Sequence, residues 1–242
     1  MSDRVAARVG RPGGLARSLA AEALGTLALV LAGTGAIVAD ARSGGAIGPV
    51  GVSLTFGLVV MAMVCATGHI SGAHLNPAVT LGFALARQFP AHRVGPYWAA
   101  QAAGALLGSL LVASLIGDAA SLGATRPAVG LERALLLEGA LTFLLMFVIM
   151  AVATDTRAAS QTAALAIGGT IALEALFAGP LTGASMNPAR SLAPALVSGD
   201  LADLWVYFVG PGLGAPLGAL AYRWVGAQPA RPASNPEGGR HD

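Results

Sequence analysis

Two short segments of this chain place polar side chains and glycines within long apolar surroundings. They are GHISGAHLNPAVTLGFALA, residues 68–86, and GPLTGASMNPARSLAPALV, residues 179–197. Each contains Asn-Pro-Ala, at Asn76-Pro77-Ala78 and at Asn187-Pro188-Ala189. Asparagine is a favoured N-cap residue and proline is favoured at the first helical position, so each tripeptide indicates the start of a helix. The chemistry that these residues offer is hydrogen bonding at a helix N-terminus.

The composition indicates a membrane protein. Of 242 residues, 55% are hydrophobic and only 11% are charged, against roughly 25% charged in an ordinary soluble domain. A helix needs about 20 apolar residues to cross the hydrocarbon core of a bilayer. Six stretches approach this length, and the sequence predicts spanning helices at about 18–39, 50–67, 94–117, 133–153, 162–179 and 203–225.

The arginines indicate how the chain lies across the membrane. With the N-terminus taken as cytoplasmic, the cytoplasmic side holds ten of the 14 basic residues: Arg4, Arg8, Arg11, Arg17, Arg87, Arg93, Arg157, Arg223, Arg231 and Arg240. The other side holds Arg42, Arg126 and Arg133. This positive-inside bias predicts that both termini are cytoplasmic. The net charge of +2 therefore reflects topology, and no nucleic-acid partner is expected.

The first apolar run and the C-terminal tail need separate interpretations. The run is over 20 residues long and contains Glu22, whereas the core of a secretory signal has about 7–15 residues. We therefore expect a retained first helix. Residues 227–242 are rich in proline, glycine and polar residues, which predicts a disordered cytoplasmic tail.

The chain contains an internal duplication. The two Asn-Pro-Ala segments match, and two further pairs of segments match in the same order: 19–31 with 135–147, and 97–111 with 207–221. The offsets of 110 to 116 residues predict one repeated unit, at about 15–118 and about 130–226. Each unit holds three spans, an odd number, so the second unit must enter the membrane from the opposite side. Inverted repeats place their functional site at the bilayer midplane, where interrupted helices meet.

The helices that begin at Asn-Pro-Ala are too short to span the membrane. Each has about 9–11 residues and follows a glycine-containing stretch. Irregular backbone at membrane depth is tolerated where it is buried in protein or lines a water-filled cavity. The sequence therefore predicts an all-α membrane protein with six transmembrane helices plus two re-entrant half-helices, in inverted duplicated three-helix repeats. Residues 1–226 are expected to form a single domain.

On these paired motifs the chain resembles the aquaporin and glycerol-facilitator family over residues 15–226. The second motif is followed by the arginine typical of the family, here Arg190. The extended segments GHISGAHLNPAVT and GASMNPARS are most similar to the plant nodulin-like branch and related bacterial channels. The resemblance implies a homotetramer with one pore per subunit in the lipid of the plasma (inner) membrane. It implies no cofactor and no metal.

The resemblance also implies a selectivity filter at an outer constriction of four residues, Phe56, Ala175, Ala184 and Arg190. Water-selective members commonly carry histidine at the position of Ala175, which argues against narrow water selectivity here. A charge at membrane depth is costly unless it faces water or a partner, so Arg190 is a functional candidate on physical grounds. In the family it donates hydrogen bonds to the solute and repels cations. A salt bridge to a buried glutamate is the alternative.

Other polar groups complete the expected pore. The resemblance implies that a solute meets the backbone carbonyls of Gly72, Ala73, His74, Gly183, Ala184 and Ser185. Glu22 and Glu138 are related by the repeat, and we expect them to brace the two loops by accepting backbone N–H groups, in preference to forming a proton relay or a metal site. Glu174 has no counterpart in the other repeat and stays unassigned. His69 aligns with Pro180, which argues against a duplicated metal site.

These features predict a passive channel for water and small uncharged solutes such as glycerol, which excludes protons and ions and is not an enzyme. A strictly water-selective channel and a secondary transporter of a small neutral solute are the alternatives. No constellation of an intramembrane hydrolase is evident in the sequence, and a structural membrane protein stays open. The dependence of solute flux on the solute gradient discriminates between these alternatives. The flux through a carrier saturates, the flux through a channel stays nearly linear, and a structural protein passes no solute.

The arginine distribution leads to a prediction about topology. A cysteine introduced near residue 235 should stay unlabelled by an impermeant thiol reagent in intact cells and become labelled once the cells are permeabilised. A cysteine placed in the loop near Arg42 is the control and should be labelled in intact cells. Labelling of the first position in intact cells would reverse the predicted orientation.

Overall fold

The computed structural model describes residues 14–154 and 162–226, which form helices and connecting loops and contain no β-strand. The six long helices are α2 (Gly14–Arg42), α3 (Gly48–Ser71), α5 (Val94–Leu115), α6 (Leu131–Thr154), α7 (Ala163–Thr182) and α9 (Val206–Val225). Two short helices, α4 (Pro77–Leu85) and α8 (Pro188–Ser198), have 9 and 11 residues. The 3-10 turns η1 (Ala91–Arg93) and η2 (Ala119–Gly123) lie in connecting loops. The expected class, with six spanning helices and two half-helices, is confirmed.

Five of the long helices are long and apolar enough to cross a membrane: α2, α3, α6, α7 and the stretch Ala91–Leu115 that contains α5. The sixth helix, α9, is as long as α7, with 20 residues. It contains four glycines, two prolines and Arg223, which make it less apolar. Three of its glycines, Gly210, Gly214 and Gly218, face α6, with which α9 makes its most extensive contacts.

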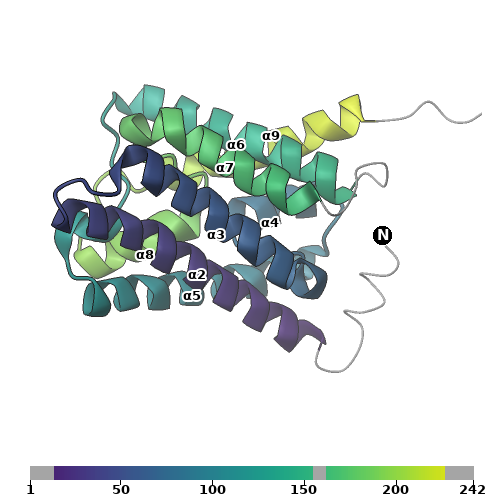
Figure 1. Ribbon diagram of the computed structural model, residues 1–242. Helices are drawn as coiled ribbons and strands as arrows, with labels where there is room; N and C mark the ends of the chain where they lie inside the picture. Colours follow the sequence, from purple (N-terminus) through teal and green to yellow (C-terminus); the bar gives the residue numbers. More distant parts are fainter. Residues whose placement is uncertain (1–13, 155–161, 227–242) are drawn as a thin grey trace, which may run out of the picture.

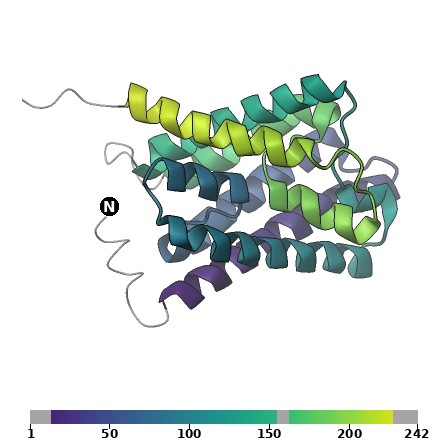
Figure 2. The same cartoon turned by 180° about the vertical axis from the view of Figure 1, so that it is seen from behind.

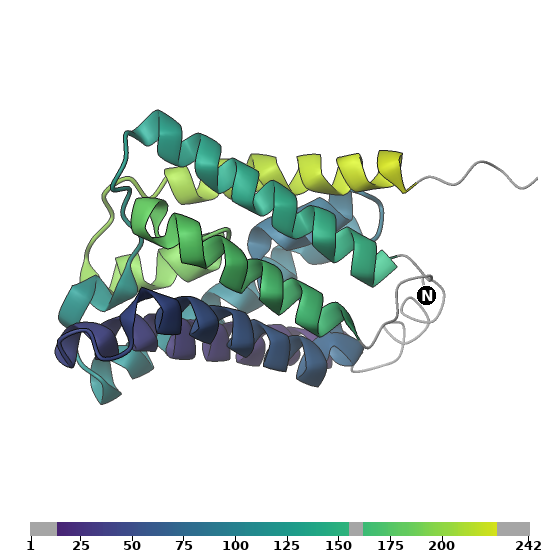
Figure 3. The same cartoon turned by 45° about the horizontal axis from the view of Figure 1, so that its top comes forward.

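The two repeats run in opposite directions, as expected from the odd number of spans in each. Figure 1 shows the equivalent helices α2 and α6 running opposite ways. The start of α2 and the end of α9 lie at the same end of the bundle (Figures 1 and 3). Arg17 and Arg223 therefore share that end. The six arginines expected in the N-terminal segment, in the loop after α6 and in the tail 227–242 lie outside the described residues.

The half-helices enter from opposite ends and are held across the repeats. α4 packs against α9 and α8 packs against α5, so the last helix of each repeat supports the half-helix of the other. Figure 2 shows α4 and α8 one after the other between the longer helices, each reaching towards the middle. This arrangement brings the two Asn-Pro-Ala segments together at the centre of the bundle.

Glycines let the equivalent helix pairs approach closely, as is usual where no hydrophobic force drives helices together. A Cβ atom on Gly104 of α5 would lie 2.0 Å from the carbonyl oxygen of Ala23 in α2. A Cβ atom on Gly214 of α9 would lie 2.2 Å from the carbonyl oxygen of Gly139 in α6. Both distances are to backbone atoms, which cannot move aside without shifting a helix.

A pair of glycine substitutions in α9 tests this packing. We expect Gly214→Ala to separate α9 from α6 and to destabilise the protein by about 1–3 kcal/mol, the usual cost of overpacking. Gly212→Ala is the matched control, because a Cβ atom there meets nothing within 4 Å. Thermal unfolding in detergent should show a lower midpoint for Gly214→Ala alone. Equal midpoints for the two variants would mean that the close approach does not limit the fold.

Candidate functional site

The two asparagines of the paired motifs cap the half-helices. Asn76 Oδ1 accepts a hydrogen bond of 2.8 Å from the backbone N–H of Ala78. Asn187 Oδ1 accepts from the N–H groups of Ala189, at 3.0 Å, and Arg190, at 3.3 Å. In each case the following proline is the first helical residue. The short helices begin where the sequence places an N-cap followed by proline.

The same asparagines link the two repeats. Asn76 Nδ2 donates a hydrogen bond of 2.7 Å to the carbonyl oxygen of Met186, and Asn187 Nδ2 donates one of 2.8 Å to that of Leu75. Each side-chain amide carries two N–H groups, and this contact uses one of them. The other is available to a molecule in the space between the helix N-termini.

The loops before the asparagines adopt the same unusual backbone in both repeats. Left-handed φ angles occur four, three and one residues before each asparagine, at Gly72 (92°), Ala73 (47°), Leu75 (50°), Gly183 (85°), Ala184 (41°) and Met186 (54°). A residue other than glycine in this region costs about 1–2 kcal/mol, so four of these six positions are strained. Strain of this kind persists only where surrounding contacts over-determine it.

In the first repeat these contacts centre on the carboxylate of Glu22, which is fully buried. Glu22 accepts hydrogen bonds from the backbone N–H groups of His74, at 2.9 Å, and Leu75, at 2.7 Å. It also accepts from the Ser71 hydroxyl, at 2.6 Å, and the Gln101 amide, at 2.8 Å.

Glu138 makes the equivalent contacts in the second repeat. It accepts from the N–H groups of Ser185, at 2.9 Å, and Met186, at 2.8 Å, and from the Thr182 hydroxyl, at 2.7 Å. Like Glu22, it is 0% exposed. Each loop therefore turns its N–H groups towards a carboxylate that belongs to the first helix of its own repeat.

This orientation has a consequence for the carbonyl groups. In a trans peptide the C=O of one residue and the N–H of the next point in opposite directions. Because the N–H groups of residues 74 and 75 point at Glu22, the carbonyls of Ala73 and His74 point away from it. The N–H of Ala73 bonds the Ser71 hydroxyl at 3.0 Å, which turns the carbonyl of Gly72 in the same way.

The second repeat does the same through Glu138 and Thr182, whose hydroxyl accepts from the N–H of Ala184 at 3.2 Å. The six carbonyls that turn away are those of Gly72, Ala73, His74, Gly183, Ala184 and Ser185. No hydrogen bond found within residues 14–154 and 162–226 uses one of these six oxygens as its acceptor.

A narrow cavity lies between the half-helices. Its volume is about 70 Å³, which is room for a few water molecules, since one needs roughly 10–15 Å³. Of the residues singled out in the sequence, the following line it: Phe56, Gly72, Ala73, His74, Asn76, Ala184, Ser185, Asn187 and Arg190. Ala175, Gly183, the three buried glutamates Glu22, Glu138 and Glu174, and the proline and alanine of each motif do not line it. α7 contributes Ile167 and Ile171 to the wall, and Ala175 lies one turn after Ile171, buried in the same apolar cluster.

Arg190 is held by neutral partners. Its side chain is 2% exposed, and Nη1 donates a hydrogen bond of 2.7 Å to the carbonyl oxygen of Gly123 in η2. Its guanidinium lies 4.8 Å from the ring centre of Phe56, a cation–π distance. Within the described part of the chain Arg190 forms no ion pair, so the salt-bridge alternative is wrong. Its remaining donors are left for a molecule in the cavity.

Several supporting residues were not singled out in the sequence. The hydroxyl of Tyr97 donates to the carbonyl of Ser71 at 2.9 Å, and that of Tyr207 donates to the carbonyl of Thr182 at 2.6 Å. Each tyrosine thus fixes the residue that begins its loop. The signal was present in the repeat, because Tyr97 aligns with Tyr207 and Ser71 aligns with Thr182.

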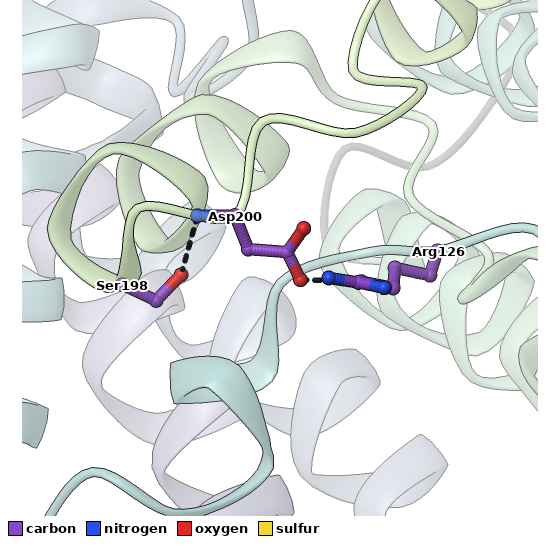
Figure 4. A network of polar contacts seen from close by, with 3 residues as sticks. All are labelled: Arg126, Ser198 and Asp200. Atoms are coloured by element: carbon purple, nitrogen blue, oxygen red, sulfur yellow. Dashed lines mark hydrogen bonds and ion pairs between the residues drawn. The ribbon is translucent and has the colours of Figure 1, made fainter.

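An ion pair between Arg126 and Asp200 joins the loop after η2 to the loop after α8, where Ser198 also accepts from the N–H of Asp200 (Figure 4). Gly123, whose carbonyl binds Arg190, is the last residue of η2 and directly precedes the first of these loops. The hydrogen bond from Arg126 lowers the pKa of Asp200 below its ordinary value of 3.8. Arg126 is 62% exposed, so solvent and salt screen this pair.

The fold and the cavity together define a class, that of helical membrane proteins in which two inverted repeats meet at a central cavity. The family model described as Major intrinsic protein matches residues 12–222, and the chain belongs to this family. This confirms the resemblance read from the paired motifs.

Individual relatives support the same family assignment. Aquaporin NIP1-4 of Oryza sativa subsp. japonica is 52% identical over 208 residues, which are 86% of this chain and 76% of the relative. Putative aquaporin NIP4-1 of Arabidopsis thaliana is 49% identical over 213 residues, 87% of this chain and 75% of the relative. Among solved structures, the aquaglyceroporin from Plasmodium falciparum superposes with a TM-score of 0.75 at 27% identity, covering 86% of this chain and 95% of that one.

The ion pair between Arg126 and Asp200 leads to a prediction about pH. Because the pKa of Asp200 is lowered, the stability that the pair contributes is complete above the ordinary pKa and is lost as the pH falls below it. We expect the thermal midpoint of Asp200→Asn to fall less between about pH 5 and about pH 3 than that of the unmodified protein. Asp118→Asn, which removes a carboxylate outside this pair, should show the full fall. The account fails if the two variants behave alike.

Proposed function

We propose that this protein is a passive channel that conducts water and small uncharged solutes such as glycerol and excludes protons and ions. The observation that carries the proposal is the pairing of opposite hydrogen-bonding walls in one narrow cavity. Peptide carbonyls that point away from the buried glutamates supply acceptors, and Asn76, Asn187 and Arg190 supply donors. A molecule with hydroxyl groups both donates and accepts, so it can exchange hydration for these contacts.

The relatives support this reading. The printed names of the two relatives call them aquaporins, and the solved neighbour is called an aquaglyceroporin. The family is one of channels and not of enzymes. We assign the six carbonyls and the paired Asn-Pro-Ala motifs to the conducting path, with Glu22 and Glu138 as the residues that brace its two loops.

The half-helices supply the basis for excluding cations. Each helix N-terminus carries roughly half a positive charge, and those of α4 and α8 meet at the centre of the bundle. Asn76 and Asn187 orient the water between them as hydrogen-bond donors. Arg190 adds a full positive charge at the outer constriction. A proton or metal cation in the file is opposed at both points.

The outer constriction decides which solutes pass. We assign it to Phe56, Ala175, Ala184 and Arg190, with two methyl groups among its four sides. Ala175 follows Ile171, the last residue of α7 that the cavity reaches, so a longer side chain at position 175 would extend towards the opening. A strictly water-selective channel is the second candidate, because Phe56 is itself bulky and lies against Arg190.

Assembly and location follow the same family pattern. We propose a homotetramer in the plasma (inner) membrane with both termini cytoplasmic and one channel domain over residues 1–226. Large apolar side chains on the outer faces of the helices, among them Leu24, Leu58, Leu173 and Leu217, are more than half exposed and suit lipid or neighbouring subunits.

Solute uptake by lipid vesicles tests the proposal. Vesicles with the purified protein should take up both water and glycerol faster than empty vesicles, without carrying a proton current that scales with water flow. Ala175→His, which adds bulk and a polar group, should lower glycerol uptake about tenfold, a barrier of about 1.4 kcal/mol. It should lower water flow less. If the unmodified protein carries water but admits glycerol at the empty-vesicle rate, the channel is water-selective, and if it carries neither, the proposal is wrong.

A further inference from the structure

We propose that Glu174 is a specificity-determining residue of this channel and that its carboxyl group accepts hydrogen bonds from the hydroxyl groups of a polyol beside the outer constriction. This inference rests on the proposed function and adds a polar group to the four filter positions.

Glu174 is buried without a partner. It is 2% exposed, and within residues 14–154 and 162–226 neither of its carboxyl oxygens has a hydrogen-bond partner. The other two buried glutamates differ, since Glu22 accepts four hydrogen bonds and Glu138 accepts three. A buried polar group without a partner costs several kcal/mol. Water or a solute would supply the partner that the described residues do not.

The position of Glu174 on α7 places it towards the conducting path. Successive residues of an α-helix are about 100° apart around its axis, so Glu174 projects within about 20° of Ile167 and about 60° of Ile171. Those two residues form the α7 wall of the cavity. Glu174 follows Ile171 in the direction of the outer end, at the level of Ala175.

The carboxyl oxygens of Glu174 are buried and do not line the cavity, so contact with a solute requires the side chain to turn towards the cavity past its small neighbours. Its neighbours on the buried face of α7 are Ala175 and Ala178, whose side chains are single methyl groups. Glu138 is the charged group that interacts electrostatically with Glu174, but no hydrogen bond joins the two, and the oxygens of Glu138 are occupied by its own loop.

A carboxyl group in this place affects a polyol more than water. Carboxyl oxygens accept hydrogen bonds in the ionised and in the protonated form. A polyol has several hydroxyl groups that must form hydrogen bonds at the same time. Arg190 can donate to the hydroxyl oxygens, but it cannot accept a hydrogen bond from the O–H groups. A water molecule in a single row of waters can instead form hydrogen bonds with the water molecules before and after it. Removing the carboxyl group should therefore slow glycerol and leave water flow nearly unchanged.

Purified protein in vesicles provides the test, with glycerol and water permeability measured on the same preparations. Glu174→Leu should lower glycerol permeability about fivefold to tenfold, the effect of losing one hydrogen bond, and change water permeability less than about twofold. Glu174→Gln, which keeps an acceptor oxygen, should retain most glycerol flow. Glu132→Gln is the matched control, because it alters an exposed glutamate at the start of α6 and should change neither rate.

Glu174→Ala removes the same group with less volume and serves if Glu174→Leu does not insert. A proportional loss of both permeabilities, or no loss of either, overturns the role of Glu174, since a purely structural residue would act on both solutes alike. If the unmodified protein admits no glycerol, the proposed solute range fails together with this inference. If it admits glycerol and the variants keep its ratio to water, only the inference fails.

Discussion

The structure depends on how two buried carboxylates are satisfied. Glu22 and Glu138 would be costly in a bilayer, and their hydrogen bonds to the loops make them tolerable. The same bonds hold alanine, leucine and methionine in left-handed conformations that the residues would not adopt alone. Because each bonded N–H turns the preceding carbonyl the other way, one interaction satisfies the charge, fixes the loop and lines the cavity with acceptors.

Much of this arrangement could be predicted from the sequence because it is periodic or repeated. Long apolar runs gave the spanning helices, and Asn76 and Asn187, each followed by proline, gave the starts of α4 and α8. The repeat paired Glu22 with Glu138, which led to their expected contact with the loops. The sixth span was predicted from its apolar length like the others, although the glycines and prolines of α9 make it less apolar than the other five, and its match to the first repeat agrees with that prediction.

Other features required coordinates because they depend on side-chain direction. The resemblance places Ala175 at the constriction, and the cavity wall on α7 is formed by Ile167 and by Ile171, one turn before Ala175. Sequence spacing does not fix the rotation and tilt of a helix, so it does not show how far the cavity extends along α7. The cross-repeat bonds of Asn76 and Asn187 were likewise beyond prediction, because they join backbone atoms whose positions follow from the fold of both loops.

The support of each half-helix by the other repeat bears on how the protein is made. The loop of the first repeat finds Glu22 within its own unit, but its Asn76 amide needs a carbonyl 110 residues further along the chain. At ordinary synthesis rates of about 5–20 residues per second, that partner emerges roughly 5–20 s later. The first repeat can therefore shape its loop on insertion, while α4 waits for α9 and the second loop. Completion of the conducting path is then among the last events of biogenesis. A chain interrupted before the loop that precedes α8 would have the first loop held by Glu22 but would lack the second loop, to which Asn76 bonds.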